Sequence, residues 1–216
     1  MKIKNILFDL DGTVINSKIG VTGSIQYALR ELGVDRIPKQ ENLVWCIGPP
    51  LQRSFSILLQ TEDKAKIDEA IRAYRYNYNH EGIYLFKLYE GIVSTIRVLK
   101  KEGFNVYIAT SKPQVMAIKI IEHASLSELF DGIYGPEFDG SRIGKGELIS
   151  YLLEKEKISA GETIMVGDRK YDILGAKENG IVSCGVKYGF GEKEELLNAG
   201  ADFIIQEPKE ILDIVR

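Results

Sequence analysis

Short apolar runs recur at the start of this chain and through its second half, and polar residues follow each of them. Each run has the length of a β-strand and is bounded by residues that favour turns. Strands are therefore predicted at residues 3–8, 105–110, 163–167, 181–186 and 202–205.

Helical stretches lie between the later strands, because apolar residues recur there at the spacing of one helix face. In the first of them, Ile92, Ile96 and Leu99 share a face. Helices are predicted at residues 91–101, 114–123, 145–157, 171–179 and 193–198. Strands that alternate with helices indicate an α/β fold with a mostly parallel sheet, covered on both faces. Ligands of such sheets bind beyond the carboxyl ends of the strands.

Residues 18–82 interrupt this alternation, since they contain helical patterns and no strong strand. Two apolar faces stand out, Ile25, Ala28, Leu29 and Leu32 on one and Ile67, Ala70, Ile71 and Tyr74 on the other. We interpret the segment as an all-helical insertion and a candidate lid. The expected domains are an α/β core at residues 1–15 and 84–216 and a helical domain at residues 16–83.

The composition is that of an ordinary soluble globular protein, with 44% apolar and 27% charged residues among 216. A formal net charge of −3 argues against a surface for nucleic acid polymers. It does not exclude a small phosphorylated metabolite as partner, because a bound divalent cation changes the local sign of the charge. The oligomeric state stays open between monomer and dimer.

Nothing in the sequence indicates a membrane or an oxidising compartment. No apolar stretch approaches the length of about 18 residues that spans a bilayer, and the first residues lack a secretory pattern. Cys46 and Cys184 lie far apart, without the spacing of metal ligands, and are expected to be buried as small apolar residues. A cytoplasmic location is expected.

Two acids, Asp9 and Asp11, end the first strand and are separated by Leu10. Strand alternation directs both carboxylates to the same side, and Gly12 then permits a sharp turn. Crowded carboxylates repel each other, so a hard cation with oxygen ligands, Mg²⁺ above all, is expected to compensate them. Taken alone, the same residues are also typical of a polar turn after a buried strand.

Later strand ends carry further polar groups. Thr110 and Ser111 offer hydroxyl and backbone N–H groups to an anion near a helix start, although a capping turn has the same pattern. Lys145, at the start of another helix, is a candidate partner for a phosphoryl group. Asp168 follows the strand at 163–167 and is a candidate metal ligand. Asp172 would bind the metal, hold a metal-bound water or a lysine, or cap the helix that it opens.

Together these residues resemble the haloacid dehalogenase superfamily over nearly the whole chain, which implies a Rossmann-like core. The matching positions, in the expected order, are Asp9-x-Asp11-Gly12-Thr13, then Thr110, Lys145 and Gly167-Asp168-x-x-x-Asp172. The helical insertion resembles a C1 cap. Phosphoglycolate-phosphatase-like proteins are the nearest likeness, and residues 130–135, 167–172 and 188–191 resemble the subgroup assigned as 5′-nucleotidases. The family often has Asp where this chain has Asn16, and Asn where it has Ser111.

The resemblance implies a Mg²⁺-dependent phosphatase that hydrolyses small phosphate monoesters. Asp9 would be the nucleophile that forms an aspartyl-phosphate, and Asp11 the general acid and base. Asp9, Asp168 and the backbone carbonyl of Asp11 would bind Mg²⁺, with Asp172 as a further ligand or a neighbour. The phosphate would be bound by Thr110, Ser111 and Lys145. Within the family, a dehalogenase needs no acid at position 11, so the presence of Asp11 favours phosphoryl transfer over dehalogenation.

Two other functions stay open. One is a phosphomutase of the same superfamily, β-phosphoglucomutase-like, which shares the intermediate; the other is a non-enzymatic phosphoacceptor module. Substrate choice is expected in the helical domain, where a turn at residues 48–51 would direct Pro49, Gln52 or Arg53 toward the site. Tyr74 and Tyr78, four residues apart, are expected to pack along a helix. Phosphoglycolate, nucleoside monophosphates and pyrophosphate all suit this outline.

Overall fold

The computed structural model describes residues 2–137 and 141–216, and the chain divides into two compact units. The first unit, here called the core unit, combines Met1–Asn16 with Leu88–Arg216. The second, here called the helical unit, is Ser17–Lys87, whereas the insertion was expected at residues 16–83.

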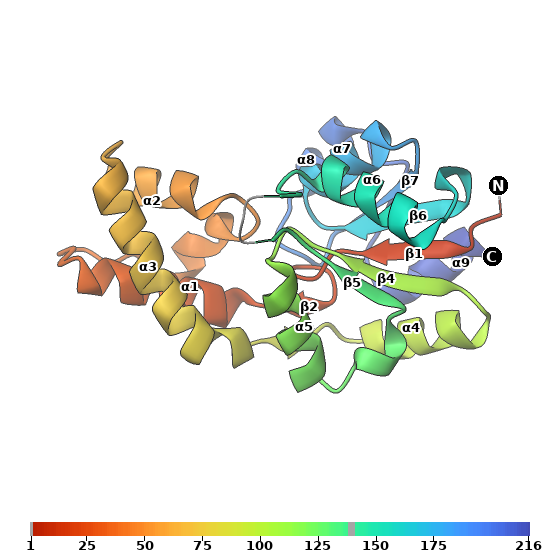
Figure 1. Ribbon diagram of the computed structural model, residues 1–216, viewed down its shortest axis with the longest axis horizontal. Helices are drawn as coiled ribbons and strands as arrows, with labels where there is room; N and C mark the ends of the chain where they lie inside the picture. Colours follow the sequence, from red (N-terminus) through yellow and green to blue (C-terminus); the bar gives the residue numbers. More distant parts are fainter. Residues whose placement is uncertain (1, 138–140) are drawn as a thin grey trace. The chain divides into compact units, whose positions relative to one another are not determined.

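A six-stranded sheet forms the centre of the core unit (Figure 1). Its strand order is β5-β4-β1-β6-β7-β8, and all neighbouring strands run parallel. The strands are β1 (Asn5–Phe8), β4 (Asn105–Ala109), β5 (Gly132–Tyr134), β6 (Thr163–Gly167), β7 (Val182–Val186) and β8 (Phe203–Ile205). The predicted α/β class is therefore confirmed.

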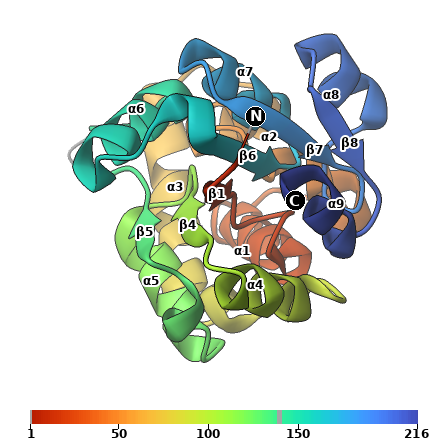
Figure 2. The same ribbon diagram turned by 90° about the vertical axis from the view of Figure 1, so that its right-hand side faces the viewer.

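Helices cover both faces of this sheet (Figure 2). On one face α6 packs beside α7, and on the other α4 packs beside α9. The helices are α4 (Ile92–Lys101), α5 (Gln114–His123), α6 (Lys145–Glu156), α7 (Lys170–Glu178), α8 (Lys193–Ala199) and α9 (Ile211–Val215). Because both faces are covered, β1 and β6 are buried at every position, which explains their continuous apolar runs.

Three strands that the sequence pattern did not predict are all short. β5 has three residues, and β2 (Ile15–Asn16) and β3 (Lys87–Leu88) have two each. β2 and β3 pair with each other in a separate two-stranded sheet where the chain leaves and re-enters the core unit. Segments this short carry no measurable alternation of apolar and polar residues.

The helical unit is built on amphipathic helices. It contains α1 (Lys18–Glu31), α2 (Leu51–Leu59) and α3 (Lys64–His80), with 3₁₀ turns η1 (Gln40–Cys46) and η2 (Gly82–Tyr84). Every residue of the two predicted apolar faces is buried except Leu32, which follows the end of α1 and is half-buried. Helices α1 and α3 pack together. Asp63 caps α3 by accepting a hydrogen bond from the Ala65 N–H at 2.9 Å. Tyr74 and Tyr78 stack with ring centroids 5.4 Å apart, which confirms their predicted packing role.

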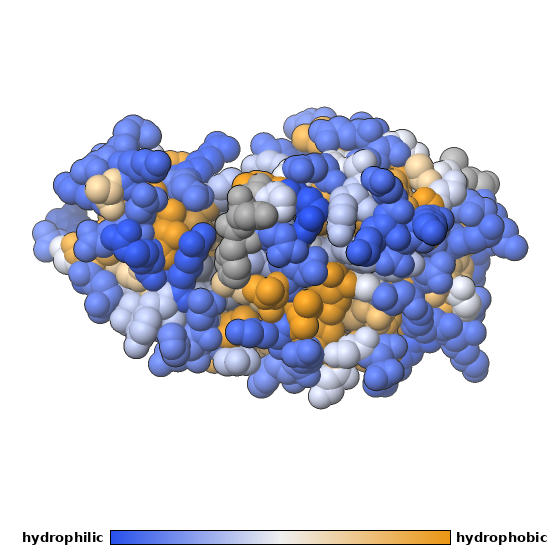
Figure 3. All heavy atoms as spheres, viewed as in Figure 1, coloured by the Kyte–Doolittle hydropathy of each residue, from blue (hydrophilic) through white to orange (hydrophobic). Residues whose placement is uncertain are grey.

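The surface agrees with the composition. The face in Figure 3 is mostly hydrophilic, with apolar side chains gathered over α5. Among the described residues, no helix combines the length and the apolar character needed to cross a membrane. Cys46 and Cys184 are both buried, as predicted.

Candidate active site

The carboxyl ends of three adjacent strands meet at one edge of the sheet. Phe8 on β1 is in register with Ile108 on β4 and with Val166 on β6. The residues that follow these strands therefore emerge side by side. They include Asp9 after β1, Thr110 after β4 and Asp168 after β6. The parallel sheet thus gathers acids that are far apart in the sequence.

A tight turn directly after β1 shapes this edge. The carbonyl oxygen of Leu10 accepts N–H bonds from Thr13, Val14 and Ile15 at 3.3, 3.0 and 2.9 Å. Gly12 adopts φ = 86°, a left-handed conformation that glycine takes without steric cost. A Cβ at Gly12 would also overlap the carboxylate of Asp168. The glycine therefore permits both the turn and the close approach of Asp168.

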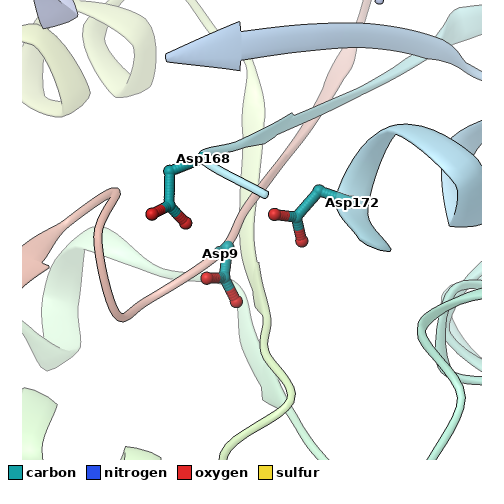
Figure 4. Close-up of side chains that lie close together, drawn as sticks. All are labelled: Asp9, Asp168 and Asp172. Atoms are coloured by element: carbon teal, nitrogen blue, oxygen red, sulfur yellow. The ribbon is translucent and has the colours of Figure 1, made fainter. Parts of the chain in front are cut away.

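Three buried aspartates converge at this edge (Figure 4). Asp9, Asp168 and Asp172 each offer a carboxylate oxygen, and these oxygens all lie within 4.8 Å of one another. Asp172 comes from the first turn of α7, whereas the other two follow strands. The structure thus brings together the three predicted metal-binding side chains, and the predicted role of the Asp11 backbone carbonyl stays a prediction.

Lys145 provides a positive charge inside this cluster. Its Nζ donates to Asp9 Oδ1 at 2.9 Å and to the carbonyl oxygen of Ala109 at 2.8 Å, and it forms an ion pair with Asp172 Oδ1 at 2.7 Å. Burial lowers the pKa of Lys145, but the charges of Asp172 and Asp9 outweigh this effect and raise the pKa above its ordinary value. The lysine therefore stays protonated at neutral pH.

One lysine does not balance the negative charge of three buried carboxylates. Burial raises the pKa of Asp9 to about 6, although Lys145 lowers it and Asp172 raises it further. Burial, together with the charges of Asp9 and Asp172, raises the pKa of Asp168 well above its ordinary value. Burial and the neighbouring negative charges thus disfavour the ionised forms, and a bound cation would offset both effects.

Asp168 supplies a direct test of whether a metal fits. Its Oδ2 accepts the backbone N–H of Phe190 at 2.7 Å, whereas Oδ1 is buried without a hydrogen-bond partner. Within residues 2–137 and 141–216, no basic side chain forms an ion pair with Asp168. A buried carboxylate oxygen without a partner is costly unless a ligand satisfies it. Together with Asp9, it fits a hard divalent cation such as Mg²⁺.

Asp172 is more fully engaged than the other two acids. Its Oδ2 accepts the backbone N–H of Arg169 at 3.1 Å, and its Oδ1 pairs with Lys145. The first contact is the helix-capping interaction that its position at the start of α7 predicts. These contacts favour a role for Asp172 as the partner that holds Lys145, rather than as a direct metal ligand.

Asp11 has a partner that sequence reasoning missed. Lys112 Nζ lies 2.9 Å from Asp11 Oδ2, and both side chains are largely buried. Asp11 Oδ1 is buried without a hydrogen-bond partner. Lys112 follows Thr110 and Ser111 at the end of β4. Its place beside two predicted phosphate-binding residues was the sequence feature that could have indicated a role in the site.

The predicted phosphate-binding residues occupy different environments. Thr110 is buried, and its Oγ1 accepts the backbone N–H of Lys112 at 3.2 Å. Ser111 is exposed in the following bend. In the helical unit, Pro49 is half-buried, and Gln52 and Arg53 are exposed in the first turn of α2. Their contact with substrate stays a prediction.

The fold and this site define a class of protein: an α/β protein whose acids gather beyond the carboxyl ends of a parallel sheet. Comparison with known proteins makes the class specific. The family profile of haloacid dehalogenase-like hydrolases matches residues 6–186. The chain belongs to this family and is an enzyme, a hydrolase of the phosphatase type. The resemblance stated from the sequence motifs is therefore confirmed.

Individual relatives support the same conclusion. The chain is 42% identical to a 5′-nucleotidase of Pseudomonas aeruginosa, over 91% of this chain and 88% of the relative. It is 31% identical to the pyrophosphatase PpaX of Halalkalibacterium halodurans, over 100% of this chain and 98% of the relative. A solved haloacid dehalogenase-like hydrolase from Streptococcus pneumoniae superposes with a TM-score of 0.91 at 34% identity, covering 99% of both chains.

Proposed function

We propose that this enzyme is a Mg²⁺-dependent phosphatase of small phosphate monoesters, with Asp9 as its nucleophile. The observation that carries the proposal is the convergence of Asp9, Asp168 and Asp172 around Lys145 at the end of β1. A nucleophilic carboxylate must be held in place and must approach an anionic phosphate. Lys145 holds the carboxylate in place by binding Asp9 Oδ1. Its positive charge also reduces the repulsion between the carboxylate and the phosphate.

The chain's own residues suffice to describe the two steps. Asp9 attacks phosphorus, an acyl-phosphate bond forms, and the bond from phosphorus to the leaving oxygen breaks. Asp11 gives a proton to that oxygen and then takes one from the water that cleaves the aspartyl-phosphate. Lys145 and Thr110 bind the phosphate oxygens. Mg²⁺, when bound, would neutralise charge on both the nucleophile and the phosphate.

Oxygen Oδ2 of Asp9 is the atom that we assign to the attack. Lys145 binds Oδ1 at 2.9 Å, so Oδ2 is the oxygen that the lysine does not hold. Asp11 lies two residues further along the same chain, and its unpartnered Oδ1 leaves one oxygen available for proton transfer. The two acids thus have different partners, as different roles require.

Substrate choice is assigned to the helical unit, which we propose as a cap. The relatives are named for different phosphate compounds, a 5′-nucleotidase and a pyrophosphatase. The 42% identity to the 5′-nucleotidase makes nucleoside 5′-monophosphates the first substrates to try. Phosphoglycolate and pyrophosphate complete the panel.

The test is release of inorganic phosphate from this panel, with Mg²⁺ and with EDTA. We expect multiple turnovers with at least one member, loss of activity in EDTA and recovery on adding Mg²⁺. Turnover that EDTA leaves unchanged would contradict the metal assignment. An isomerised sugar phosphate without free phosphate would indicate the phosphomutase, and a single phosphorylation without turnover would indicate a phosphoacceptor.

A further inference from the structure

Residues 188–191, between β7 and α8, form a segment that the proposed reaction does not use. This segment lies against Asp168 rather than facing away from it. The backbone N–H of Phe190 donates to Asp168 Oδ2 at 2.7 Å. Asp168 is fully buried, so this bond forms away from water, where a bond to a charged group is strongest.

Two glycines allow the segment to come this close. A Cβ at Gly189 would overlap Asp168 Cβ and the carbonyl oxygen of Gly12. A Cβ at Gly191 would overlap the carbonyl oxygen of Asp168. The segment therefore lies directly against both Asp168 and the turn at Gly12, and any larger residue at either glycine must displace backbone atoms.

An aromatic contact anchors the start of the segment in the core unit. The ring of Tyr188 packs against Tyr89 with centroids 4.9 Å apart. Burial raises the pKa of both hydroxyls, so both stay neutral at physiological pH. Tyr89 itself is held beside the turn after β1, because its N–H donates to the Val14 carbonyl at 3.2 Å. The segment is thus tied to the same turn that carries Asp9 and Asp11.

We propose that residues 188–191 are a positioning element that sets which oxygen of Asp168 faces the metal. A carboxylate rotates easily about its last side-chain bond, so its orientation must come from its partners. Phe190 holds Oδ2, and Oδ1 is left as the buried oxygen without a partner. The inference rests on the proposed Mg²⁺ site and adds the groups that organise it.

The test is Mg²⁺ binding to Gly189→Ala, measured by isothermal titration calorimetry without substrate. Partners that orient a metal ligand typically contribute about 10- to 100-fold in metal affinity, and we expect a loss of that size. Gly161→Ala is the matched control. A Cβ at Gly161 would come no closer than 3.9 Å to a described neighbour, Ser159 Oγ. Gly161 also precedes β6, whereas Asp168 follows the other end of that strand. The Mg²⁺ affinity of Gly161→Ala is expected to equal that of the wild type. Circular dichroism and thermal unfolding of both variants check that each remains folded.

A second measurement needs no disruptive variant. In wild-type protein labelled with ¹⁵N-phenylalanine, the Phe190 amide resonance, assigned by its loss in Phe190→Tyr, is expected to shift when Mg²⁺ is added. Wild-type affinity in folded Gly189→Ala, or a Phe190 amide unmoved by Mg²⁺ that does bind, would overturn this inference. Failure of the wild type to bind Mg²⁺ would instead overturn the proposed metal site.

Discussion

Strands β1 and β6 are neighbours in the sheet, and each is a fully buried run that ends in an aspartate, yet the two aspartates are held in different ways. Asp9 is bound by a lysine side chain, which carries a full positive charge. Asp168 is bound by a backbone N–H, and glycines enclose it. Similar sequence patterns at two strand ends therefore lead to different pairing: Asp9 is paired with a lysine, whereas Asp168 accepts a hydrogen bond from the backbone.

The difference matches the roles that we propose. A nucleophile needs one oxygen held and one free, and it must move toward phosphorus during the reaction. A metal ligand needs a fixed orientation and a charge that only the metal neutralises. Four substitutions separate these roles, and they follow in order of decreasing expected effect.

Asp9→Asn should have the largest effect, because it removes the nucleophile and keeps the shape of the side chain. Loss of a nucleophile typically lowers kcat by about 10⁴-fold or more, and we expect that loss in phosphate release. Asp213→Asn, the same change at an exposed position on α9, is the control. Phosphate release by Asp9→Asn within tenfold of the wild-type rate would refute the nucleophile assignment.

Lys145→Met should have the second-largest effect and should act on stability as well. It leaves Asp9 and Asp172 buried without their cation, and breaking a buried ion pair typically costs about 3–5 kcal/mol. Urea unfolding in EDTA measures this cost. Lys4→Met, which breaks an exposed ion pair with Glu162, is the control and should cost at most about 1 kcal/mol. Equal losses in the two variants would show that the burial of Lys145 does not matter.

Asp168→Asn should stabilise the metal-free protein, in contrast to Lys145→Met. It removes one of three crowded acids, and its amide oxygen can still accept the Phe190 N–H. Relief of such functional strain typically adds about 0.5–2 kcal/mol to the free energy of unfolding. The same variant should lose the stabilisation that Mg²⁺ gives the wild type. Thermal unfolding with EDTA and with Mg²⁺ tests both statements, and lower stability in EDTA would contradict the first.

Asp63→Ala should have the smallest effect. Asp63 also accepts a backbone N–H, but it is exposed and makes a helix cap in the helical unit. Loss of a cap typically costs about 1 kcal/mol. Phosphate release at saturating substrate should stay at the wild-type rate. A loss of stability larger than that of Lys145→Met would show that buried charge is not what distinguishes the core site.

The fold was predictable where the sequence carries long patterns. The buried runs of β1, β4, β6 and β7 and the predicted helices are present within one or two residues at most ends. β5 was missed because Gly132–Tyr134 is too short to show a period, and its place comes from pairing with β4. The paired strands β2 and β3 were missed for the same reason.

The site was predictable where chemistry resides in side chains at strand ends. Asp9, Asp168, Asp172 and Lys145 do meet, because parallel strands end at one edge. The contact between Phe190 and Asp168 could not be predicted in this way, since a backbone N–H leaves no mark on residue type. Only the glycines that flank Phe190 hinted at a close approach.

The pairing of β2 with β3 has a consequence for how the chain folds. Asn5 on β1 must find Asn105 on β4, 100 residues away, and the helical unit occupies most of the intervening chain. The helical unit also closes on itself, because the Gly20 N–H donates to the Leu85 carbonyl at 3.1 Å. Once it has folded, its two ends are adjacent, and the loop that β1 and β4 must close becomes short. Early folding of the insertion would therefore lower the entropic cost of assembling the sheet and speed its formation.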